Sequence, residues 1–110
     1  MAKIEGSGPS PKDVAAYKSE CNRAADLFQQ ALDERHKSKD NPNKQGEMEK
    51  IMDKAKHIMQ QTTHALRQKE LEEREKKLVK DYNDFKKEPS DAKKQILDQD
   101  VSDIKDTLNK

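Results

Sequence analysis

The stretch from Met48 to Phe85 most constrains what this chain can fold into, because it has the pattern of one long amphipathic helix. Its apolar residues recur at steps of three and four, which places them on one side of a helix. They are Met48, Ile51, Met52, Ala55, Ile58, Met59, Ala65, Leu66, Leu71, Leu78, Val79, Tyr82 and Phe85.

The middle of this stretch, Arg67 to Lys77, contains a single apolar residue, Leu71. The five-residue step from Leu66 to Leu71 moves the apolar stripe to another side of the helix. Acidic residues in this segment nevertheless stand four positions before basic ones, and each such pair stabilises a helix by about 0.2 to 0.5 kcal/mol. We therefore predict one long helix, from about residue 44 to 86, with a break near residues 66–71 as the open alternative.

Proline-containing segments separate the long helix from a shorter helix on each side. Pro42 and Pro89 disfavour helical backbone at the residues before them, so a turn is predicted at each. Ser10 can cap a helix that has Pro11 at its first position, and Ser90 can cap another. Helices are therefore predicted at about 11–37 and 91–109.

The predicted fold is all-α, with three helices in an antiparallel hairpin arrangement around the long central helix. This gives an elongated three-helix bundle or a coiled-coil-like rod. Residues 1–9 are expected to form a flexible N-terminal segment, and residues 10–110 a single helical domain. Each short helix would cover only half of the long one. Apolar surface around Met52, Met59, Leu66 and Leu97 is therefore expected to stay exposed.

The composition argues against several classes of partner. The 23 Lys and Arg residues nearly balance 22 Asp and Glu residues, whereas nucleic-acid binding needs a basic surface. Apolar runs are short, such as Val14-Ala15-Ala16, so no membrane span is expected. A single Cys and no apolar leader at the start lead us to expect a cytoplasmic protein.

No pattern of residues predicts a metal site, a cofactor or catalysis. His57 and His64 are seven residues apart on one helix, about 10 Å along its axis, too far to share an ion. Cys21 lies in an apolar stripe and is expected to be a small buried side chain. The acidic run from Asp98 to Asp106 lacks the glycine and spacing of a calcium loop, so it is interpreted as a solvated face. An enzyme is not expected.

The segment QQALDERHKSKDNPNKQGEMEKI, residues 29–51, resembles the helical hairpin of type III secretion needle proteins and small secretion chaperones. Those hairpins also join two helices by a turn rich in Pro, Asn and Asp. The resemblance implies a secretion-system needle or chaperone-like component. The last helix and the charged middle of the long helix depart from the needle pattern.

The leading functional hypothesis is a non-enzymatic protein-interaction module, an adaptor, small chaperone or assembly factor that presents amphipathic helix faces to a helical partner. The alternative is a self-associating structural coiled-coil protein, in which a second copy covers the apolar stripes. Nucleic-acid binding is a distant alternative. The residues expected to bind the partner are Phe28, Leu32, Met48, Met52, Met59, Leu66 and Leu97.

Overall fold

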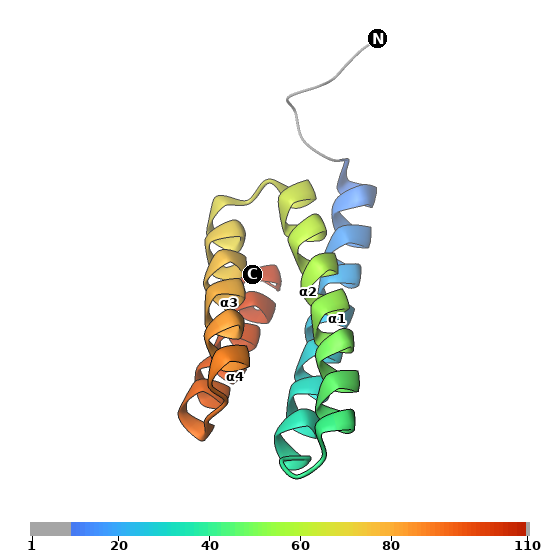
Figure 1. Ribbon diagram of the computed structural model, residues 1–110. Coiled ribbons are helices and arrows are strands. Elements are labelled where there is room, and N and C mark those ends of the chain that lie inside the picture. The colour runs from blue at the N-terminus through green and yellow to red at the C-terminus, as the bar shows by residue number, and fades with distance from the viewer. Residues whose placement is uncertain (1–9, 110) are drawn as a thin grey trace.

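A computed structural model describes residues 10–109, and these residues form four helices. The helices are α1 (Pro11–Lys37), α2 (Pro42–Leu66), α3 (Lys69–Lys87) and α4 (Asp91–Leu108). They run alternately up and down, as two hairpins that pack side by side (Figure 1). The all-α prediction is confirmed, and the fold is an up-and-down four-helix bundle. The expected flexible segment 1–9 lies outside the described residues.

Three of the four helices begin at capping side chains; Ser10 and Ser90 were expected from the sequence, whereas Asn41 caps α2 about two residues before its predicted start. The side chains of Ser10, Asn41 and Ser90 each accept a hydrogen bond from the backbone N–H three residues on, at 3.3, 3.1 and 3.2 Å. Pro11 and Pro42 follow two of these caps, where a missing N–H costs nothing. These starts are set locally, because cap and helix are neighbours in the chain.

The prediction of one continuous helix at 44–86 is wrong, because α2 ends at Leu66 and α3 begins at Lys69. Arg67 adopts the left-handed conformation, with φ 57° and ψ 33°. That conformation costs a residue other than glycine about 1 to 2 kcal/mol. Folding α3 back fully buries Leu71, Leu78 and Phe85, at about 1.5 to 3 kcal/mol each. Burial of the second half of the stripe therefore outweighs the strained turn.

One hydrophobic core runs between the four helices, and it includes the apolar residues that were expected to remain exposed. Met52, Met59 and Leu97 are 0% exposed and Leu66 is 5% exposed. That expectation is wrong because it assumed two-helix segments, whereas four helices enclose a core. Among the described residues, the exposed large apolar side chains are Leu27 and Ile96.

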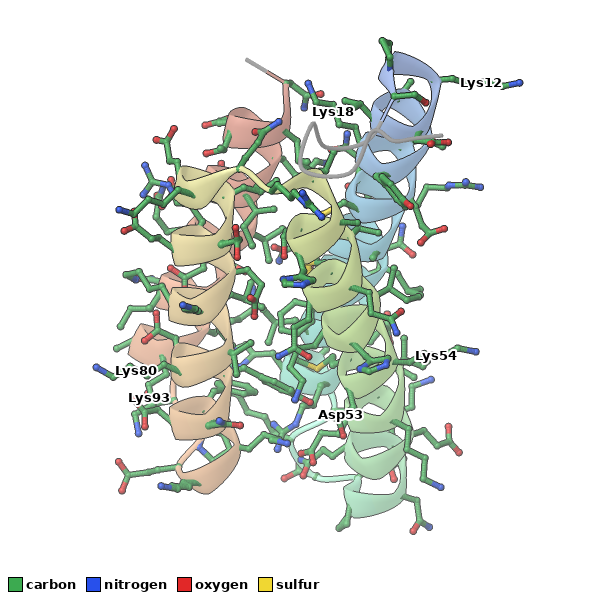
Figure 2. All side chains as sticks on the ribbon, turned by 90° about the horizontal axis from the view of Figure 1, so that it is seen from above. Lys12, Lys18, Asp53, Lys54, Lys80 and Lys93 are labelled. Carbon is green, nitrogen blue, oxygen red and sulfur yellow. The ribbon has the colours of Figure 1, made fainter. Side chains whose placement is uncertain are left out.

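The bundle is tighter within each hairpin than between the hairpins. Residues of α1 and α2 contact each other most densely, followed by α3 with α4, while the α1–α4 and α2–α3 interfaces are sparser. Figure 2 shows side chains filling the space between the hairpins, whereas Lys54 and Lys80 point outward. Phe28 of α1 meets Tyr82 of α3 edge to face, with ring centroids 5.2 Å apart. The Tyr82 hydroxyl donates to Asp53 Oδ1 at 2.8 Å.

Candidate functional site

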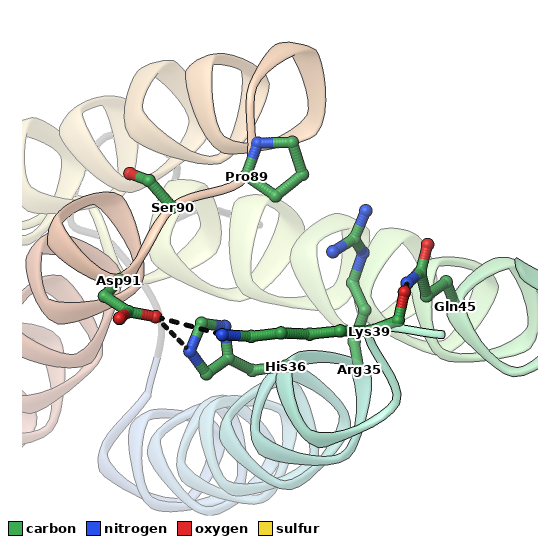
Figure 3. Close-up of a pocket in the computed structure, with 7 residues that line it drawn as sticks. All are labelled: Arg35, His36, Lys39, Gln45, Pro89, Ser90 and Asp91. Carbon is green, nitrogen blue, oxygen red and sulfur yellow. Dashed lines mark hydrogen bonds and ion pairs between the residues drawn. The ribbon is translucent and has the colours of Figure 1, made fainter. Parts of the chain in front are cut away.

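A polar pocket of about 320 Å³ lies at the end of the bundle where the α1–α2 turn meets the α3–α4 turn (Figure 3). The two turns lie at the same end only because the chain reverses at Arg67 (Figure 1). In the predicted three-helix rod, they would lie at opposite ends of the long helix. The residues that line the pocket are Arg35, His36, Lys39, Gln45, Pro89, Ser90 and Asp91.

Within the pocket lining, Asp91 contacts two basic side chains. Asp91 Oδ1 lies 2.7 Å from His36 Nε2 and 3.5 Å from Lys39 Nζ, as the dashed lines of Figure 3 mark. The charge of Lys39, together with the hydrogen bond from His36, holds the pKa of Asp91 below its ordinary value. The side chains of Lys39 and Asp91 are 64% and 75% exposed. Water therefore screens this pair, and breaking it costs little.

Arg35 forms the inner wall of the pocket and is held more tightly. Its Nε and Nη2 atoms lie 2.8 and 2.7 Å from Glu49 Oε2, and its side chain is 8% exposed. The guanidinium carbon also lies 4.9 Å from the centre of the Phe85 ring, in a cation–π contact that joins the two hairpins. Arg35 therefore supplies a fixed positive charge whose hydrogen bonds are already used in part by Glu49.

Gln45 and Ser90 give the two turns their shape. Gln45 Nε2 donates to the carbonyl oxygens of Ser38 and Lys39, both at 2.9 Å, and so ties the start of α2 to the α1–α2 turn. Ser90 Oγ accepts from the Lys93 N–H as the cap of α4, so the hydroxyl serves the helix rather than His36. With these two side chains engaged in the turns, the basic groups that line the pocket are those of Arg35, His36 and Lys39. The Asp91 carboxylate is the exchangeable acceptor of the last two. This chemistry suits the oxygens of an anionic group.

The pocket contains none of the seven residues that the sequence singled out for partner binding. Six of them, Phe28, Leu32, Met52, Met59, Leu66 and Leu97, are buried in the core. Met48 is partly buried and packs against that core. The expectation that these side chains form an exposed docking face is therefore wrong, because the two hairpins cover each other's apolar faces. Among the pocket residues, the sequence singled out only Pro89, as part of a turn, and Ser90, as a helix cap.

A second polar cluster lies between α3 and α4, at Asp100. The Asp100 side chain is 1% exposed, and its Oδ1 accepts from Lys77 Nζ at 2.8 Å. Lys77 also donates to Asp81 Oδ2 at 2.9 Å. Burial, together with a hydrogen bond to Asp81, raises the pKa of Asp100 to about 7. Although burial opposes it, hydrogen bonds from Asp100 and Lys77 lower the pKa of Asp81. The interpretation of the acidic run as a wholly solvated face is thus wrong at Asp100.

Three further features of the described residues bear on the expected partners and ligands. Within residues 10–109, no three His, Cys, Asp or Glu side chains converge as metal ligands would. No helix in that range has the length and apolarity to cross a membrane. Cys21 is fully buried, and burial raises the pKa of its thiol.

No protein-family model, curated protein or solved structure gives a significant match to this chain.

Proposed function

We propose that this chain is a non-enzymatic protein-interaction module, an adaptor, small chaperone or assembly factor, that binds an acidic group of a helical partner protein. The pocket between the two hairpin turns is the binding site. The observation that carries the proposal is the exchangeable pairing in its lining, where the largely exposed Asp91 occupies the donors of His36 and Lys39.

A carboxylate of a partner would take the place of Asp91. The exchange costs little, because water screens the exposed pair of Asp91 and Lys39 and the incoming acid forms a similar one. The N-terminus of α4 lies beside the pocket and favours negative charge there. Arg35 adds a fixed positive charge at the inner wall. Affinity for a single carboxylate would be low, so the partner must present its acid on a larger contacting surface.

The test uses a glutamate-rich helical peptide as the probe, with its glutamine counterpart as the control peptide. Lys39→Gln is expected to weaken binding of the glutamate peptide by about twofold to fivefold, since it removes one exposed charge pair. Asp91→Asn is expected to strengthen binding by a similar factor, because it removes the competing carboxylate. Fluorescence anisotropy would measure both affinities, and backbone amide shifts would locate the peptide.

Lys54→Gln is the matched control, because Lys54 is an exposed lysine of α2 that does not line the pocket. It should leave the affinity unchanged. The proposal fails if Lys39→Gln and Lys54→Gln have the same effect, or if Asp91→Asn weakens binding. It also fails if the glutamine peptide binds as well as the glutamate peptide.

A further inference from the structure

The link between the two hairpins is strained and contains neither a turn-forming residue nor a capping side chain. Arg67 is the one residue other than glycine with a positive φ among the described residues. Gln68, at the start of α3, makes no side-chain capping bond, whereas the side chains at the other three helix starts do. No Gly or Pro occurs between Glu47 and Glu88. This turn therefore exists because the packed hairpins require it.

Contacts between hairpins hold the strained link closed. On one side, Asp33 of α1 pairs with Lys94 of α4 at 3.0 Å, and Gln29 Nε2 donates to Asp98 Oδ1 at 2.6 Å. On the other, Tyr82 of α3 bonds Asp53 of α2 and packs on Phe28. If the hairpins separate, these contacts are lost. A second copy of the chain carries the same side chains, so its hairpin can form the same contacts.

We propose that the α3–α4 hairpin exchanges between two copies of this chain, with the link at Arg67 and Gln68 as the hinge. In the exchanged dimer, α1 and α2 of one copy pack against α3 and α4 of the other, through the same side chains as in the monomer. Exchange needs no new surface, so the buried apolar residues stay buried. Its driving force is the release of Arg67 from the left-handed conformation.

This inference is independent of the proposed ligand pocket. It concerns the opposite end of the bundle (Figure 1) and a different partner, a second copy. It also differs from the self-association expected from the sequence, which relied on exposed apolar stripes. In the exchanged dimer, the interface is the existing core between the hairpins.

Substitutions at Arg67 test the hinge, because this side chain is exposed. Arg67→Gly relieves the strain in the monomer and is expected to weaken dimerisation by about fivefold to tenfold. Arg67→Val, with a β-branched residue that fits a positive φ poorly, is expected to strengthen it by a similar factor. Gln61→Val, an equally exposed position within helix α2, controls for the added apolar surface. Sedimentation equilibrium would measure all three dissociation constants.

A zero-length carbodiimide cross-link distinguishes hairpin exchange from surface dimerisation. Heavy-isotope and normal chains are unfolded together, refolded and separated by size, and the reagent then joins Lys94 to Asp33 across the hairpins. Peptide pairs with one heavy and one normal half are expected in the dimer fraction and not in the monomer fraction. The inference is overturned if the dimer yields only pairs of like isotope. It is equally overturned if wild type and Arg67→Val both remain monomeric at millimolar concentration.

Discussion

Between about pH 5 and pH 8, the free energy of unfolding of the wild-type bundle is expected to fall, and Asp100→Asn is expected to remove much of that fall. The pKa of Asp100 rises from an ordinary value near 3.8 to about 7 in the folded chain. The native state therefore holds a proton that the unfolded chain has already released. The contribution of protonated Asp100 to the free energy of unfolding is fully present below about pH 4, and it is lost as the pH rises through about 7.

The expected size of this effect is roughly 2 to 4 kcal/mol, since one pKa unit corresponds to about 1.4 kcal/mol. Asparagine keeps the geometry of the site: its oxygen can accept from Lys77 and its amide can donate to Asp81. The lowered pKa of Asp81 acts with the opposite sign, but only near and below pH 4, outside this window. Glu75, whose pKa is also raised by burial, adds a slope that Asp100→Asn leaves in place.

Denaturant unfolding at several pH values would measure the effect. Asp106→Asn is the control, because it removes an exposed carboxylate from the same helix and should leave the pH dependence as it is. Equal slopes for the Asp100 and Asp106 variants would show that the buried carboxyl is ionised throughout this range.

Leu32→Ala is expected to destabilise the bundle by about 2 to 5 kcal/mol, whereas Leu27→Ala should cost less than about 1 kcal/mol. The two leucines lie on α1, but Leu32 is 0% exposed and Leu27 is 40% exposed. Truncation at Leu32 leaves a cavity between packed helices, while truncation at Leu27 removes atoms that already contact water. Urea unfolding with unchanged slope m would report the difference as a shift of the midpoint.

This pair of variants also tests the docking role that the sequence suggested for Leu32. A side chain on an open docking face would tolerate alanine with little loss of stability. Similar effects at Leu32 and Leu27 would therefore contradict the closed bundle. Met52 and Met59 are buried as well, so Met52→Lys and Met59→Lys would place charges in the core. If these variants failed to bind a partner, the loss would reflect unfolding and would not identify a binding face.

The start of α1, the two proline-containing turns and the all-α class could be predicted because each depends on residues close together in the chain. Ser10 caps a turn that begins beside it, and Pro42 restricts its own neighbour. The helical period likewise identified the residues that need burial, since Leu32, Met52 and Leu97 all lie in the core. The helical period did not predict which helices cover these residues, because an apolar stripe shows which face of a helix is buried and not which helix packs against it.

The sequence by itself determined where three helices start, which sides of them are apolar and how evenly charge is spread. Only the tertiary structure decided that the long stripe is cut at Arg67, because the shift of the stripe between Leu66 and Leu71 does not by itself end a helix, and burial of the far half outweighs the strain. That one reversal brings Asp91 to His36 and closes the core over the expected docking face. The packing of α4 on α3, in turn, buries Asp100. Each of these contacts joins residues far apart in the chain, so its free energy enters only when the helices pack.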